Sequence, residues 1–156
     1  MQVAHVVHGA CVRTLLIGLV VLAGGCSPSA LEFDIGECVN LPDAETIDEY
    51  ETVDCDEVHD AEVFALPTQP GGEEAAYPGA QAMDDLARQE CEGEQFESYV
   101  GTAYPDSALY YLSLSPSQES WERAGDREVV CLLVGEPLED ESEFTQLTGS
   151  KKGSAE

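Results

Sequence analysis

The densest group of chemically capable side chains in this sequence lies around His59, which Asp60 and Glu62 follow within three positions. Carboxylates and an imidazole gathered in one turn are ligands that divalent cations accept. The same side chains can instead hydrogen-bond the turn's own backbone and orient the start of a strand. Because no D-x-D-x-D-G calcium-loop pattern is present, the structural interpretation is favoured, and a solute- or cation-binding module is the alternative.

The first 25 residues are typical of an export signal. Arg13 supplies positive charge and precedes an apolar run over residues 15–23. This run has the length of a signal-peptide centre, about 7–15 residues, and is shorter than the roughly 20 residues that cross a bilayer. We therefore predict a signal peptide over residues 1–25.

Small residues lead directly to Cys26, in the order Leu-Ala-Gly-Gly-Cys. This arrangement resembles the bacterial lipoprotein signal, in which cleavage precedes the cysteine and the thiol then carries diacylglycerol. Two acyl chains hold a protein stably on a membrane. We predict lipid attachment at Cys26, a tether over residues 26–32, and a location on the extracytoplasmic face of the cell membrane. Secretion with an unmodified cysteine is the alternative.

Four further cysteines are expected outside the cytoplasm, where thiols oxidise: Cys38, Cys55, Cys91 and Cys131. Of the three possible connectivities we favour Cys38–Cys55, which would staple a hairpin, and Cys91–Cys131, which would pin a helix to a strand. A zinc site is the competing hypothesis, because Cys55-x-x-x-His59 has plausible ligand spacing and Cys38 could join it. Since no C-x-x-C pair is present, we expect no metal and no cofactor.

The charge of the chain excludes one class of partner. Asp and Glu number 32 against 6 Lys and Arg, for a formal net charge of −26. Nucleic-acid binding needs many basic side chains to release counterions, so we expect none. The charge is compatible with cation binding, with a basic partner, or with a solvated surface.

Hydrophobic periodicity predicts the elements that must position these residues. Strands are expected over residues 35–41, 50–55, 61–66, 108–114 and 127–134. A helix is expected over residues 79–100, with a bend at Gly93 and apolar positions at helical spacing: Met83, Leu86, Ala87, Cys91 and Tyr99. In the last strand, Val129, Cys131 and Leu133 should share one face.

A short helix is predicted between residues 115 and 125, with Ser115 as its N-cap, Pro116 at its first position and Gln118 in a capping box. It carries Trp121, which could be an exposed anchor for a partner, although burial in the core is favoured. Beyond Gly135 the chain is acidic without apolar periodicity. We therefore predict a disordered tail over residues 136–156.

The sum is one α+β domain over residues 33–135. A mainly antiparallel sheet packs against one long helix, with one short helix added and two disulfides as staples. We expect a monomer.

Several segments resemble the septum-formation domain, a family of actinobacterial envelope proteins. They are Gly36-Glu37-Cys38, Cys55-x-x-x-His59-Asp60-Ala61-Glu62-Val63, Tyr77-Pro78-Gly79 ahead of Cys91, Ser115-Pro116-Ser117-Gln118-Glu119-Ser120-Trp121, and Gly125-Asp126-Arg127-Glu128-Val129-Val130-Cys131-Leu132-Leu133. The resemblance spans residues 33–134. It implies a domain outside the membrane, behind a membrane helix or lipid anchor, with a role linked to the division septum.

Catalytic signatures are lacking in the sequence. It contains no G-x-S-x-G and no phosphate-binding glycine loop, and its carboxylates are too numerous for one pair to stand out as a glycosidase couple. We therefore expect a non-enzymatic envelope lipoprotein that binds a protein partner, with an enzyme acting on wall polymer ranked last.

Overall fold

The computed structural model describes residues 31–42, 49–72, 74–138 and 143–156. The predicted signal peptide and Cys26 lie outside these residues. The described part confirms the α+β class. Its main sheet has the order β2-β1-β4-β6-β5, with every neighbouring pair antiparallel. The strands are β1 (Cys38–Asn40), β2 (Glu51–Val53), β4 (Ala61–Ala65), β5 (Tyr110–Leu114) and β6 (Val130–Val134).

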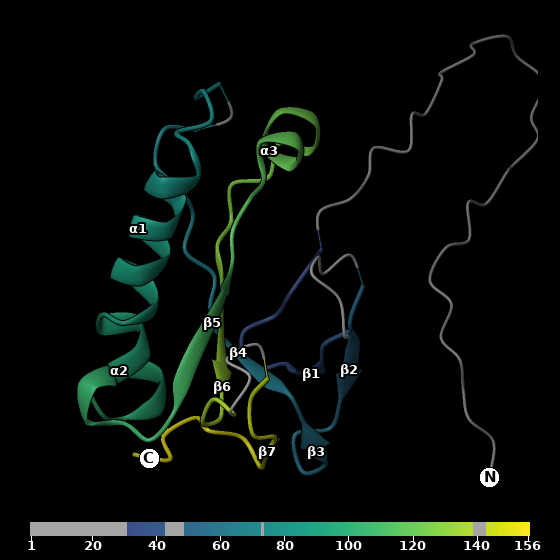
Figure 1. Ribbon diagram of the computed structural model, residues 1–156, viewed down its shortest axis with the longest axis vertical. Coiled ribbons are helices and arrows are strands. Elements are labelled where there is room, and N and C mark those ends of the chain that lie inside the picture. Colours follow the sequence, from purple (N-terminus) through teal and green to yellow (C-terminus); the bar gives the residue numbers. More distant parts are fainter. Residues whose placement is uncertain (1–30, 43–48, 73, 139–142) are drawn as a thin grey trace, which may run out of the picture.

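A two-stranded sheet joins distant parts of the sequence, because β3 (Val58–His59) pairs with β7 (Leu147–Thr148). The helices are α1 (Ala80–Cys91), α2 (Glu94–Val100) and α3 (Gln118–Ala124), and Tyr104–Asp106 form a 3-10 turn. Figure 1 shows α1 and α2 lying end to end along one side of the main sheet, with α3 at one end of the molecule. Among the described residues, no helix is both long and apolar enough to cross a membrane.

The central strands are buried on both faces, as expected for strands with neighbours on each side. In β6, Cys131 and Leu133 pack with Val129 against the helices, while Val130, Leu132 and Val134 pack on the opposite face. This two-residue alternation is the one predicted from the sequence. The opposite face is covered by residues near the start of the domain and by Phe144, so both sides of the sheet carry a hydrophobic core.

The long helix is interrupted where the sequence predicted a bend. Met83, Ala87 and Cys91 recur every four residues and face the sheet. At Gly93 the helix breaks, and a Cβ built there would lie 2.5 Å from the carbonyl oxygen of Gln89. The glycine therefore permits a close backbone approach that lets α2 continue at an angle to α1.

Two local predictions need correction. The strand predicted over residues 35–41 begins only at Cys38, because Gly36 adopts a φ of +93° in a turn. The N-cap of α3 is Ser117 and not Ser115: the Ser117 hydroxyl accepts from the backbone N–H of Ser120, and the Ser120 hydroxyl accepts in return. The capping box is thus built by two serines, with Gln118 as the first helical residue.

Both predicted disulfides are confirmed. Cys38 bonds to Cys55 between β1 and the end of the β2 hairpin, and Cys91 bonds to Cys131 between α1 and β6. Their sequence separations are 17 and 40 residues. Loop-closure entropy for such separations corresponds to about 3 and about 4 kcal/mol of stability.

The end of the chain differs from the expected disordered tail. Residues 143–156 include β7, and their backbone bonds to the body of the domain. The N–H of Gly149 donates to the Cys55 carbonyl at 2.7 Å, and that of Gly153 donates to the Tyr99 carbonyl at 2.8 Å. Backbone hydrogen bonds hold this segment in place. Such bonds need no apolar side chains, so the segment shows no hydrophobic periodicity in the sequence.

Candidate functional site

The most chemically capable group of side chains lies at the corner where β1, β3 and β4 meet the C-terminal segment. We call it the Glu62 cluster: Cys38, His59, Glu62, Tyr99, Ser150 and Lys151. Strand register explains its centre, because Cys38 lies directly opposite Glu62 on the antiparallel β1–β4 pair. Directly opposed residues project from the same face of a sheet, so the sulfur and the carboxylate are neighbours.

His59 enters the cluster from the adjoining small sheet. Its side chain is 0% exposed, as is that of Glu62, and these two are the buried polar or charged residues of the described chain. Three possible donor atoms lie within 4.8 Å of one another: the Sγ of Cys38, one ring nitrogen of His59 and one carboxylate oxygen of Glu62. The Cys38 sulfur is bonded to that of Cys55.

The orientation of the His59 ring is set by the backbone. Its Nδ1 lies 2.9 Å from the Glu57 carbonyl, which can only accept, so Nδ1 carries the proton. In the neutral ring the lone pair is then on Nε2. This Nε2 atom is buried and has no hydrogen-bond partner among the described residues.

Glu62 is held as an acceptor by three donors from distant parts of the chain. The Tyr99 hydroxyl and the Ser150 hydroxyl both donate to Oε1 at 2.6 Å. The backbone N–H of Lys151 donates to Oε2, also at 2.6 Å. Three such bonds compensate for removing the carboxylate from water.

These contacts also affect Tyr99. Burial first, and then the hydrogen bond to Glu62, raise the pKa of the Tyr99 phenol well above its usual 10.0. The phenol therefore stays protonated and remains a donor to the carboxylate over the whole physiological range.

Asp60, predicted as part of the same group, lies elsewhere. Its Oδ2 accepts from the backbone N–H of Leu41 at 3.0 Å, and its Oδ1 accepts from the Gln146 amide at 2.9 Å. The structure therefore brings His59 and Glu62 together without Asp60. The favoured interpretation was that polar side chains of this turn hydrogen-bond backbone groups. Asp60 does so, through its bond to the backbone N–H of Leu41.

Trp121 is not an exposed anchor. It is 2% exposed, and its indole N–H donates to the Ala75 carbonyl at 2.8 Å. The Arg127 guanidinium lies 3.7 Å from the ring centroid. The side chain belongs to the core beneath α3, as the favoured interpretation held.

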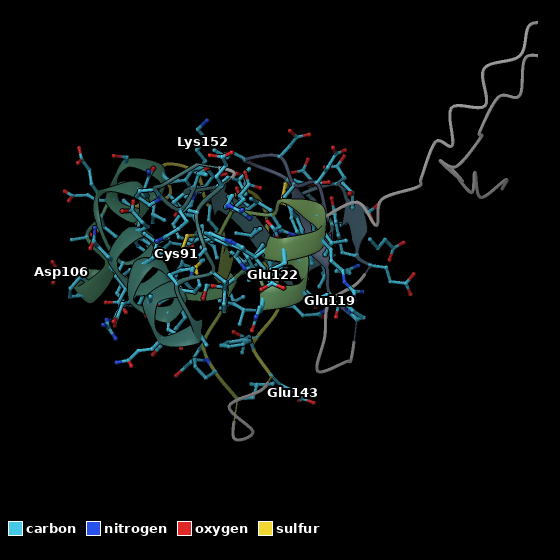
Figure 2. The ribbon with its side chains drawn as sticks, turned by 90° about the horizontal axis from the view of Figure 1, so that it is seen from above. Cys91, Asp106, Glu119, Glu122, Glu143 and Lys152 are labelled. Atoms are coloured by element: carbon cyan, nitrogen blue, oxygen red, sulfur yellow. A yellow bond between two sulfur atoms is a disulfide. The ribbon has the colours of Figure 1, made fainter. Side chains whose placement is uncertain are left out.

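The outer surface is acidic. The carboxylate residues Asp106, Glu119, Glu122 and Glu143 are exposed. Figure 2 shows Asp106 and Glu143 at the edge of the view and Glu119 and Glu122 on α3. The basic side chains of the described residues contact the protein itself. Arg88, Arg123 and Lys151 form ion pairs with Asp85, Glu119 and Glu156, Lys152 lies over the Tyr99 ring, and Arg127 lies over that of Trp121.

Sequence reasoning missed Tyr99, Ser150 and Lys151 as members of the cluster. Tyr99 was recognised only as an apolar position of the helix. Ser150 and Lys151 fell within the predicted tail, and they reach Glu62 across 88 and 89 residues. A buried glutamate in a central strand was the available signal, since such a residue must find donors somewhere in the fold.

Comparison with known proteins identifies a family. The model of the septum formation family matches residues 35–155, which include the C-terminal segment.

Two curated relatives are each described as an uncharacterized membrane protein of Mycobacterium tuberculosis, one from strain CDC 1551 / Oshkosh and one from strain ATCC 25618 / H37Rv. Each is 30% identical over 105 residues, which cover 63% of this chain and 23% of the relative. The chain thus spans about a quarter of the length of these relatives. No solved structure matches the chain.

Proposed function

Because this chain belongs to the septum formation family, we propose that it is a non-enzymatic, lipid-anchored protein on the extracytoplasmic face of the cell membrane that binds a basic envelope protein during septum formation. Three features support this proposal: the lipoprotein-like signal ending at Cys26, the family match, and the membrane proteins among its relatives.

The imbalance of surface charge is the observation that supports a basic partner. The described basic residues are already engaged within the domain, whereas many carboxylates face solvent. Such a surface steers a positively charged partner toward it and repels a second copy of itself. A segment of the partner rich in Lys and Arg fits this field.

The chemically capable Glu62 cluster supports a non-enzymatic role. His59 and Glu62 are sealed from solvent, and Glu62 is engaged by three donors. A substrate has no access to these groups while the domain is folded as observed. Recognition through the exposed surface is therefore favoured over chemistry at this site.

Anchoring is tested by Cys26→Ser, with Cys11→Ser as the matched control. We expect Cys26→Ser to move the protein from the membrane fraction to the soluble extracytoplasmic fraction, and Cys11→Ser to leave it membrane-bound. A Cys26→Ser protein that remains firmly in the membrane would rule out the lipid anchor.

The septal role is tested by imaging a fluorescent fusion through division. Enrichment at the septum is expected, and a uniform membrane signal throughout the cycle would contradict it. The partner is tested by photocrosslinking from Glu122 and Asp106, which are exposed, since probes at Glu62 or Trp121 would be buried. The crosslink from Asp106 should weaken when Glu119→Lys and Glu122→Lys reverse the charge of α3.

A further inference from the structure

We propose that reduction of the Cys38–Cys55 disulfide converts the Glu62 cluster into a binding site for a zinc-type divalent metal ion, held by Cys38, Cys55, His59 and Glu62. The first observation is geometric. Donor atoms from Cys38, His59 and Glu62 lie within 4.8 Å of one another, and Cys55 is covalently joined to Cys38. Two sulfurs, one imidazole and one carboxylate form a ligand set that zinc accepts in four-coordinate sites.

The second observation is the unpartnered nitrogen of His59. A fully buried polar atom without a partner is rare in folded proteins. Here Nδ1 donates to the Glu57 carbonyl at 2.9 Å, which leaves a lone pair on Nε2. Metal-binding histidines characteristically donate their other ring N–H to a carbonyl or carboxylate in this way. The ring is thus already in the tautomer that a metal requires.

Glu62 retains capacity for a metal despite its three hydrogen bonds. Its Oε1 accepts two donors, but its Oε2 accepts only the N–H of Lys151. Because each carboxylate oxygen has two lone pairs, Oε2 can bind a cation without losing that bond. The three donors would also orient the carboxylate for the ion.

The reduction step balances with a dithiol reductant. A thiolate of the reductant attacks one sulfur of Cys38–Cys55, and a mixed disulfide forms as the S–S bond breaks. The second thiol of the reductant then releases the protein, so the reductant becomes a disulfide and both cysteines become thiols. Metal binding displaces the two thiol protons into solvent.

Burial directs the reductant to this disulfide. Cys55 is partly exposed, whereas Cys38, Cys91 and Cys131 are buried, with Cys91 and Cys131 each 0% exposed. Attack requires access to a sulfur, so Cys38–Cys55 should be reduced before Cys91–Cys131.

The test uses the full chain carrying Cys11→Ser and Cys26→Ser, so that the four disulfide cysteines are the ones remaining. The chain is treated with limiting phosphine reductant and titrated with Co²⁺, whose visible bands report tetrahedral thiolate coordination. We expect one equivalent to bind only after reduction and to be displaced by Zn²⁺. Zn²⁺ should also raise the Tm of the reduced chain and leave that of the oxidised chain unchanged.

Two variants distinguish this site from adventitious thiols. His59→Asn preserves a donor at the Nδ1 position toward the Glu57 carbonyl but removes the Nε2 ligand, so Co²⁺ should bind at least tenfold more weakly. Cys91→Ala combined with Cys131→Ala should leave the cobalt spectrum intact. Cobalt bands that persist in His59→Asn, or that vanish in the Cys91/Cys131 variant, overturn the proposal. So does a reduced chain that unfolds and does not regain its near-ultraviolet circular dichroism with Zn²⁺.

Discussion

The hydroxyl of Tyr99 donates to the carboxylate of Glu62 at 2.6 Å across 37 residues of sequence. This bond joins α2 to the central strand β4, and Ser150 and Lys151 close over the same carboxylate from the end of the chain. One buried acidic group thus connects three segments that are far apart in the sequence. Substitution of Glu62 should therefore lower the free energy of unfolding more than substitution of an acidic residue on the surface.

Glu62→Gln should lower the free energy of unfolding by about 2–4 kcal/mol, because the new amide turns a donor toward groups that are themselves donors. Urea unfolding with the disulfides intact measures the change. The matched control is Glu57→Gln on the exposed turn nearby, which should stay within about 0.5 kcal/mol of the parent. Equal effects of the two substitutions would show that the buried network contributes nothing.

Truncation after Gly149 should destabilise the domain even though it removes only seven residues, 150–156. It deletes the Ser150 and Lys151 donors to Glu62 and the backbone bonds made by Gly153 and Ala155. We expect a loss of at least about 2 kcal/mol, since a buried carboxylate is left under-satisfied. Hydrogen exchange should show faster opening of β7 and of the end of α2. An unchanged unfolding midpoint would mean that the segment is dispensable.

Alkaline pH should weaken the fold through two tyrosines. Burial, followed by the hydrogen bond to Glu92, raises the pKa of Tyr111 to about 12, and that of Tyr99 is raised as well. As the pH rises through 10, the unfolded chain loses phenolic protons that the folded chain keeps. The unfolded state then binds fewer protons, so the free energy of unfolding falls with pH.

The measurement is urea unfolding between about pH 9 and about pH 11, a range that brackets the ordinary tyrosine pKa. The stability present below pH 10 should be lost progressively as the pH approaches 12. Tyr99→Phe combined with Tyr111→Phe should make this dependence shallower, and Tyr50 and Tyr104, whose pKa values burial also raises, account for what is left. If the double variant shows the same slope as the parent, these phenols are not its source.

Gly93→Ala should be destabilising, against the usual trend for helices. Replacing glycine by alanine inside a helix normally stabilises it by up to about 1 kcal/mol. Here the added Cβ would meet the Gln89 carbonyl oxygen at 2.5 Å, so the α1–α2 junction must shift. We expect a cost of about 1–3 kcal/mol by thermal or urea unfolding. Gln95→Ala, at an exposed position in α2, is the control and should be near neutral.

Much of the fold was predictable because it depends on local periodicity. The alternation of Cys131 and Leu133 with Leu132 marks a strand buried on both faces, and the four-residue spacing of Met83, Ala87 and Cys91 marks the helix that covers it. With those two elements facing each other, the Cys91–Cys131 bond followed. The sequence placed the N-cap of α3 two residues too early. Ser115 and Ser117 have the same side chain, and only the position at which the helix begins decides which one caps it.

By itself the sequence determined the acidic charge and the periodicity that marks the main strands and helices, because each depends on nearby residues or on simple composition. The sequence favoured one of three disulfide pairings, and the structure shows that pairing. Only the tertiary structure decided what Glu62 contacts and what the last residues do. The partners of Glu62 come from 37, 88 and 89 residues away, and the C-terminal segment is secured by hydrogen bonds, which leave no hydrophobic pattern along the chain. Long-range polar contacts of this kind exist only after the sheet and helices have brought their donors and acceptors together.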